Sequence, residues 1–165
     1  MRAAELADRL RDRFPEVALA LGEATVVVDR GELLETLERL RDDPDVSLGF
    51  LSSVTATDHP GRVPRYWVVY ELLSIERGHR LRVKVGVPEE DARVPSVVGL
   101  YPTANWHERE VFDFFGIAFE AHPDLTRILL PDGWEGHPLR KTEELGGVDT
   151  RFKGAFVPPV DRRRS

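Results

Sequence analysis

The amino-acid sequence predicts an α+β fold, a two-layer sandwich in which helices cover one face of a mixed or antiparallel sheet. Apolar residues recur at helical spacing near residues 6–14, 33–40 and 104–115. Strand-like runs rich in valine and aromatic residues lie between these segments. The predicted order is helix, two strands, helix, three strands, helix. A two-layer sandwich is the economical way for these elements to bury one face each.

The first predicted elements are a helix and a hairpin. The helix carries an apolar stripe and ends at Pro15. The stripe consists of Leu6, Leu10 and Phe14. The runs VALAL and ATVVVD flank the pair Gly22-Glu23, so these residues predict a short β-hairpin.

A second helix is predicted to follow the hairpin. Asp29 precedes Glu32 by three residues, which matches a capping box at a helix N-terminus. The helix ends before Pro44. Its expected apolar stripe consists of Leu33, Leu34, Leu37 and Leu40.

The next segment reads as three strands joined by the turn-rich stretches DHPGRVP and IERGH. Connections this short imply an antiparallel meander. A third helix is predicted over Ala104 to Phe115, with Gly116 as its C′ residue. No sustained period continues beyond Gly116, so the chain divides into an α+β domain, residues 1–116, and an extended C-terminal docking arm, residues 117–165.

The arm needs a surface to lie on. Fixing one residue's backbone costs about 1–2 kcal/mol, and the arm has no repeating apolar face with which to offset this cost. Yet LTRILLP, GWEGHPL and FKGAFVPP carry large apolar side chains, which disordered linkers lack. We therefore expect the arm to lie across another protein's surface. The alternative is that it folds back over its own body.

Composition excludes several classes of function. The net charge of −6 argues against a nucleic-acid binder, because phosphate contacts need a basic face. The absence of cysteine removes disulfides, thiolate metal sites and a cysteine nucleophile. No run of about 18 apolar residues predicts a membrane span, and the charged start is not a secretory signal.

The predicted helix at 104–115 is apolar on two sides. Ala104, Val111, Phe112 and Phe115 share one face with Glu108, whereas Trp106, Glu110 and Phe114 lie opposite. Such a helix needs two packing surfaces, unless it is an ordinary core helix with snorkelling charges. An unpaired Glu108 among aromatic residues would cost several kcal/mol, so we expect an arginine or backbone N–H groups beside it.

Several catalytic patterns fail on spacing. HEREV begins like the zinc-binding motif H-E-x-x-H, but the position of the second histidine is occupied by Val111. DFFG resembles the magnesium-binding motif of kinases, but the chain lacks their Gly-rich loop and catalytic-loop asparagine. No G-x-G-x-x-G follows a strand, so a dinucleotide has no evident binding loop. His122, Asp124 and His137 form a loose cluster that could ligate a metal in a small hydrolase, although His-Pro pairs more often form turns.

The stretch ANWHEREVFDFFGIAFEAHPDLTRILLPDGWEGHPLRK closely resembles the C subunit of proton-translocating NADH:quinone oxidoreductase, respiratory complex I. The family pattern combines an E-R-E helix, a D-[FYM]-[FY]-G-I turn, H-P-D-L-x-R-[IL]-L and W-x-G-H-P-L-R-K. Two departures are visible. Glu120-Ala121 stands where a glycine commonly precedes the histidine, and Thr142-Glu143-Glu144 follows Lys141 in place of D-[YF]-P.

The resemblance implies a non-catalytic structural subunit of the peripheral arm, on the cytoplasmic side of the cell membrane. It implies packing against the quinone-site subunit and the subunit that holds the terminal iron–sulfur cluster. Iron–sulfur clusters, FMN and quinone are expected in other subunits, so membrane association is indirect and this chain binds no cofactor. The alternative is the equivalent subunit of a membrane-bound [NiFe] hydrogenase or another quinone-linked dehydrogenase.

No catalytic, cofactor-binding or metal-ligating residue is expected under this resemblance. Glu108, Arg109, Glu110 and Asp113 would order the helix end, and the residues after it would dock partner subunits. The full set of expected docking residues is Trp106, Glu108, Arg109, Glu110, Asp113, Phe114, Gly116, His122, Asp124, Arg127, Trp134, His137, Arg140 and Lys141.

Overall fold

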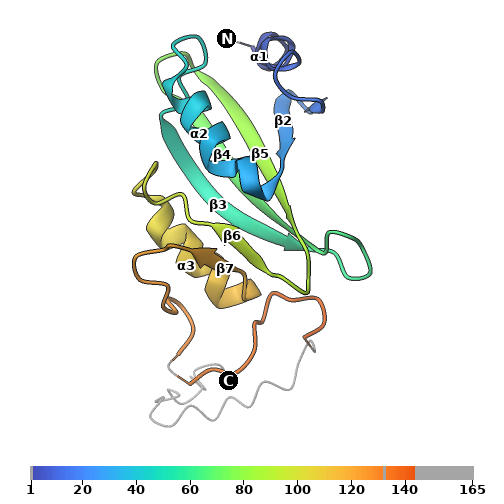
Figure 1. Ribbon diagram of the computed structural model, residues 1–165, viewed down its shortest axis with the longest axis vertical. Coiled ribbons are helices and arrows are strands. Elements are labelled where there is room, and N and C mark those ends of the chain that lie inside the picture. Colours follow the sequence, from blue (N-terminus) through green and yellow to red (C-terminus); the bar gives the residue numbers. More distant parts are fainter. Residues whose placement is uncertain (1, 132, 144–165) are drawn as a thin grey trace, which may run out of the picture.

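The computed structural model describes residues 2–131 and 133–143, and it confirms the predicted α+β class; the predicted elements occur in the predicted order, with two short strands, β6 and β7, in addition (Figure 1). The helices are α1 (Ala3–Leu10), the 3-10 turn η1 (Arg30–Glu32), α2 (Leu33–Asp42) and α3 (Ala104–Phe115). The strands are β1 (Val17–Ala20), β2 (Glu23–Val28), β3 (Phe50–Asp58), β4 (Tyr66–Ser74), β5 (His79–Val87), β6 (Arg93–Pro95) and β7 (Ala118–Glu120). None of the described helices is long and apolar enough to cross a membrane.

The main sheet is mixed, with the strand order β1-β2-β5-β4-β3. β2 and β5 are parallel, and the other neighbouring pairs are antiparallel, as the short turns predicted. Side chains alternate between the two faces of a strand, so Val26, Val83, Tyr70 and Val54 lie in register on one buried face. That face forms one side of the core.

The helices supply the other side of the core. α1 buries Leu6 and Leu10, and α2 runs across the sheet in Figure 1. α3 packs against β3, and the Tyr101 hydroxyl just before it donates to Leu48 O at 2.9 Å. Buried residues of all three helices join one hydrophobic cluster with the sheet. The sandwich therefore has two layers.

The predicted capping box at α2 is wrong. The Asp29 side chain makes no capping hydrogen bond. Instead the chain forms η1, in which the Glu32 N–H donates to Asp29 O at 3.0 Å, and α2 starts at Leu33, directly after η1. The predicted stripe is also narrower, because Leu34 is 42% exposed while its neighbour Leu33 is buried. One residue is a rotation of about 100° on a helix, enough to leave the core face.

The core extends past Gly116, where the domain boundary was predicted. β7 pairs in parallel with β6 and places Phe119 beside Val94. Ile117 and Phe119 are both buried in the main core cluster. Strands of three residues are too short to show a period, so the sequence pattern did not reveal β6 or β7. The predicted arm beyond residue 143 lies outside the described residues.

Candidate functional site

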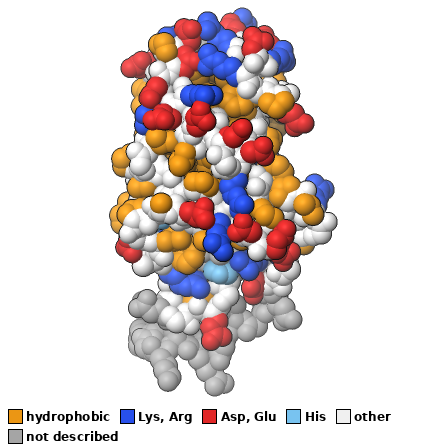
Figure 2. Space-filling view, viewed as in Figure 1, with side chains coloured by type: hydrophobic (Ala, Val, Ile, Leu, Met, Phe, Trp, Pro, Cys, Tyr) orange, Lys and Arg blue, Asp and Glu red, His pale blue; other side chains and the backbone are white. Residues whose placement is uncertain are grey.

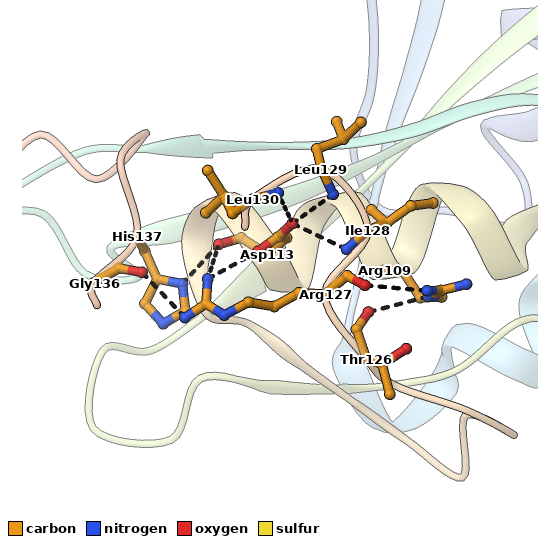
Figure 3. A network of polar contacts seen from close by, with 9 residues as sticks. All are labelled: Arg109, Asp113, Thr126, Arg127, Ile128, Leu129, Leu130, Gly136 and His137. Carbon is orange, nitrogen blue, oxygen red and sulfur yellow. Dashed lines mark hydrogen bonds and ion pairs between the residues drawn. The ribbon is translucent and has the colours of Figure 1, made fainter. Parts of the chain in front are cut away.

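Residues 121–131 and 133–143, here called the strap, follow β7 and lie against the C-terminal end of α3 (Figure 1). The strap contains most of the motif residues that follow the helix. Its polar groups and those of α3 bind one another in the network that Figure 3 shows. The described part of the arm thus folds back on its own body, which was the alternative to lying on a partner.

Asp113 is the centre of the network. Its side chain is not exposed, and its Oδ2 accepts the backbone N–H groups of Ile128, Leu129 and Leu130 at 3.1, 2.9 and 2.9 Å (Figure 3). Its Oδ1 accepts from Arg127 Nη1 at 2.8 Å. Burial raises the pKa of Asp113, but the three N–H groups and the guanidinium outweigh burial and hold that pKa below its usual value. The carboxylate therefore fixes a backbone turn of the strap.

The strap also caps the C-terminus of α3. The last turn of a helix leaves carbonyl groups without intrahelical partners. His137 Nδ1 lies 2.9 Å from Asp113 O, Leu139 N–H donates to Phe114 O at 3.2 Å, and Arg140 Nε donates to Phe115 O at 2.7 Å. The HPLR motif is therefore a cap for the helix that precedes it.

Gly116 is required by two separate features of this cap. Its φ is +70°, the left-handed conformation that favours glycine at a helix end. A Cβ at this position would lie 2.4 Å from Arg140 Nη2 and 2.5 Å from His137 Nε2. The absence of a side chain lets both capping residues approach the helix end.

Arg109 holds the start of the strap from the exposed side of α3. Its Nε donates to Thr126 O at 3.0 Å and its Nη2 donates to Arg127 O at 3.1 Å (Figure 3). The same guanidinium lies 5.3 Å from the ring centroid of Trp106, a cation–π contact. Trp106 remains 62% exposed, so the stack covers only part of the indole.

The end of the strap binds the base of the β3–β4 hairpin. Asp58 and Arg65 form a buried two-point ion pair with distances of 2.8 and 2.9 Å. The Lys141 N–H donates to Asp58 Oδ2 at 2.7 Å, and Arg65 Nη2 donates to Thr142 Oγ1 at 3.2 Å. The hydrogen bond with Arg65 lowers the pKa of Asp58. Sequence reasoning missed this pair, although opposite charges at the two ends of one hairpin loop were a signal for it.

Glu108 is buried on the inner face of α3, as the helical wheel predicted. Its carboxylate accepts from Ser96 Oγ at 2.6 Å and from the Val97 N–H at 2.7 Å. The expected backbone N–H is present, and among the described residues no arginine pairs with this carboxylate, whose Oε2 lies 3.9 Å from His122 Nε2. Burial raises the pKa of Glu108 to about 7, because these two hydrogen bonds compensate only part of the lost hydration.

The structure separates the three residues of the metal hypothesis. His122 Nδ1 accepts the Asp124 N–H at 3.0 Å, and His122 Nε2 lies 3.2 Å from Asn105 O, whereas His137 caps the other end of α3. Within residues 2–131 and 133–143, no group of three or more histidine, aspartate or glutamate side chains could hold a metal ion. The hydrolase hypothesis thus has no site in the described chain.

The remaining motif residues lie around the outside of this network. Trp106, Glu110 and Asp124 are exposed, and so is Lys141, whose backbone alone binds the hairpin. The Glu110 carboxylate has no hydrogen bond or ion pair with any residue the structure describes. Two other motif residues outside the network, Phe114 and Trp134, are half-buried. The motif therefore contains inward residues that bind the chain itself and outward residues that face away from it.

Comparison with known proteins identifies this arrangement. The family "Respiratory-chain NADH dehydrogenase, 30 Kd subunit" matches residues 26–149. The C subunit of the NADH-quinone oxidoreductase of Salinispora arenicola is 48% identical, over 98% of this chain and 69% of that protein. The C subunit from a Nocardioides species is 47% identical, over 92% of this chain and 61% of that protein. The chain thus spans roughly two thirds of the length of these relatives.

Solved structures agree with the sequence comparison. A trypsin-resistant fragment of Nqo5, residues 1–134, superposes with a TM-score of 0.66 and 36% identity, covering 76% of this chain and all of the fragment. A chain of an archaeal membrane-bound sulfane sulfur reductase superposes with a TM-score of 0.73 and 26% identity, covering 86% of this chain and 85% of that one. The family match covers most of the chain, from within β2 through β7, α3 and the strap, so this chain belongs to the family of the 30 kDa subunit of respiratory-chain NADH dehydrogenase.

Proposed function

We propose that this chain is a structural, non-catalytic subunit in the peripheral arm of a proton-translocating NADH:quinone oxidoreductase. The observation that carries the structural role is the direction of the motif's polar groups. Asp113, Arg127, His137 and Arg140 all bind backbone atoms of α3 or the strap. Side chains engaged in this way stabilise a surface and are not arranged to transfer protons or bind substrate.

In this proposal the electrons pass through iron–sulfur clusters, FMN and quinone in other subunits, and this chain binds no cofactor. Its partners are the quinone-site subunit and the subunit with the terminal iron–sulfur cluster. It lies on the cytoplasmic side of the membrane and is attached through the complex. The absence of cysteine supports the proposal that other subunits bind the iron–sulfur clusters, because this chain cannot supply thiolate ligands to a cluster.

The outward motif residues supply the docking surface in this proposal. Trp106 and Arg109 are stacked, and exposed tryptophan and arginine side chains are enriched among the residues that dominate binding energy at interfaces. Glu110 lies exposed on the same helix, and Asp124 is exposed on the strap. The inward network would hold α3 and the strap in the shape that these residues present to a partner.

The sulfane sulfur reductase match shows that this fold also occurs in another respiratory membrane complex. The identity in that match is 26%, compared with 47–48% for the two NADH-quinone oxidoreductase subunits. The higher identity favours the NADH:quinone oxidoreductase over the hydrogenase-type alternative.

Affinity purification of the tagged chain from native membranes tests the proposal. We expect the iron–sulfur and quinone-site subunits to co-purify, together with an NADH-binding flavoprotein. Recovery of the chain alone would contradict the proposal. Recovery with a nickel-site large subunit and without the flavoprotein would support the hydrogenase-type alternative.

Matched variants test the docking surface. Trp106→Ala and Glu110→Gln should each reduce the yield of co-purified subunits while the free energy of unfolding of the isolated chain changes by less than about 1 kcal/mol. Glu76→Gln, in the turn between β4 and β5, is the control and should leave the yield unchanged. Equal yields for all three variants would exclude a docking role for the outer face of α3.

A further inference from the structure

A groove lies beside α2, at the opposite end of the domain from the strap. Its walls are α2, the end of β2 and the connection between α1 and β1, and its volume is about 1050 Å³. Cavities of several hundred Å³ or more are large enough to enclose a ligand or several side chains of a protein partner. We call this cavity the α2 groove.

The lining of the α2 groove combines apolar and acidic residues. Phe14, Pro15 and Val27 contribute apolar surface, and Val27 is 38% exposed although it belongs to a strand. Figure 2 shows acidic and basic side chains interspersed with exposed apolar ones on this half of the molecule. An exposed valine in a concave surface is a place where a partner's apolar side chain would displace water favourably.

The charge of the lining is strongly unbalanced. Six of the lining residues are acidic and two are basic, and both arginines are already paired: Arg13 with Asp43 and Arg39 with Glu35. The other acidic groups include Glu16, Asp29 and Glu32, which have no ion pair with any residue in the described part of the chain. A partner that fills this groove must therefore bring positive charge.

We propose that the α2 groove binds a basic amphipathic segment of another protein, with apolar side chains on Val27 and Phe14 and lysine or arginine beside Glu16, Asp29 and Glu32. An anionic membrane surface or a nucleic acid would be repelled by the same carboxylates. The carboxylates do not converge as metal ligands among the described residues, so separate cations along a peptide match them better than one ion. This inference is independent of the proposed respiratory function.

Titration of the full-length chain with a synthetic peptide tests the chemistry. A helical peptide of about 14 leucine and lysine residues, with leucine on one face, should bind, and the matched leucine–glutamate peptide should not. The double variant Glu16→Lys/Glu32→Lys should weaken binding of the basic peptide about tenfold, because two surface ion pairs become two repulsions. Calorimetry at low and high salt measures both affinities.

The control is an equal charge reversal elsewhere, Glu76→Lys/Glu90→Lys, at two exposed positions outside the groove. If this control weakens binding as much as the groove variant, the peptide responds only to net charge and the proposal is overturned. Absence of binding by the basic peptide overturns it as well. The proposal is also overturned if the chain self-associates and the Glu16→Lys/Glu32→Lys variant abolishes this association, because the groove is then occupied by a second copy of the chain.

A photo-crosslinking residue at Thr36, inside the groove, examines the protein in its native membranes. We expect a cross-linked peptide from another protein, rich in lysine or arginine, that disappears in the Glu16→Lys/Glu32→Lys background. A cross-link to lipid, or to a peptide without basic residues, would contradict the proposal. Failure here leaves the co-purification test of the respiratory function unaffected, so the two proposals can fail separately.

Discussion

The Asp113→Asn substitution removes one charge from the network that joins α3 to the strap, and leaves the side-chain shape almost unchanged. The wild-type carboxylate accepts three backbone N–H groups and one guanidinium within 3.1 Å. The asparagine oxygen can still accept the N–H groups, but only as neutral hydrogen bonds. The asparagine amino group then faces Arg127, which places two donors against each other.

The expected loss of stability follows from these contacts. A hydrogen bond to a charged group stabilises by about 1.5–3 kcal/mol and a neutral one by about 0.5–1.5 kcal/mol, so three weakened bonds cost about 3 kcal/mol. Loss of the Arg127 pair adds about 1 kcal/mol, a figure reduced because the arginine side chain is 27% exposed. We expect Asp113→Asn to lower the free energy of unfolding by about 3–5 kcal/mol.

Urea denaturation of the full-length chain, followed by tryptophan fluorescence, measures this difference. The difference should be pH-dependent in a defined sense. The folded-state pKa of Asp113 is lowered, so its contribution is present above the unfolded-state pKa of about 3.9 and is lost as the pH falls through the folded-state value. Wild type and variant should therefore differ fully between pH 5 and 8 and converge in stronger acid.

Asp124→Asn is the matched control, because the Asp124 carboxylate is exposed on the same strap and has no ion pair with the described residues. It should change the free energy of unfolding by less than about 0.5 kcal/mol. The reasoning is refuted if Asp113→Asn lies within 1 kcal/mol of wild type at pH 7, or if both variants lose the same stability.

Three further substitutions test other parts of the site and the core. Gly116→Ala should lower the free energy of unfolding by about 2–4 kcal/mol: about 1 kcal/mol from the left-handed backbone conformation, and the rest from displacement of the His137 and Arg140 side chains that cap α3. The control is Gly99→Ala, whose added Cβ meets no atom within 4 Å and which should leave the free energy of unfolding nearly unchanged in the same urea assay. The pKa of Glu108 is raised from 4.5 to about 7, so the contribution of Glu108 to the stability of wild type should fall by about 3 kcal/mol as the pH rises from 4.5 through 7. Glu108→Gln lacks this loss and should be the more stable protein at pH 8; parallel pH profiles for the two proteins would contradict the assignment. Burial lowers the pKa of His79, so the unfolded chain binds the proton more readily and the contribution of His79 to stability should fall as the pH drops below about 6.5, opposite in sign to the Glu108 contribution. Thermal unfolding should show this as a melting-temperature difference between wild type and His79→Leu that changes with pH below about 6.5, and a difference that is constant with pH would contradict the prediction.

Local sequence patterns were sufficient for the main elements. The spacing of Leu6 and Leu10, the alternation along β4 and β5 and the glycine after α3 each report a geometry that repeats or ends within a few residues. The same patterns failed at β6 and β7, which have three residues each and no repeat to detect. The capping box failed because a backbone bond of η1 took the place of the Asp29 side chain.

The motif residues show most clearly the difference between what the sequence indicates and what only the tertiary structure reveals. Their order along the chain indicated the family before any contact was known, and the comparisons confirmed it. Their directions could not be predicted, because Lys141 and Asp58 are 83 positions apart and Asp113 meets the strap only after the chain turns back past β7. Which groups meet across such separations depends on the path of the whole backbone, which no local pattern records.

The sequence alone therefore determined the fold class, the family and the presence of a chain segment that needs a surface. Only the tertiary structure decided that the described part of this segment uses the protein's own helix as that surface. The physical reason is the hydrogen-bonding requirement of buried groups: the Asp113 carboxylate and the last carbonyls of α3 need donors, and the strap supplies them at 2.7–3.2 Å. The motif residues that remain exposed, among them Trp106 and Glu110, are the ones available to a partner.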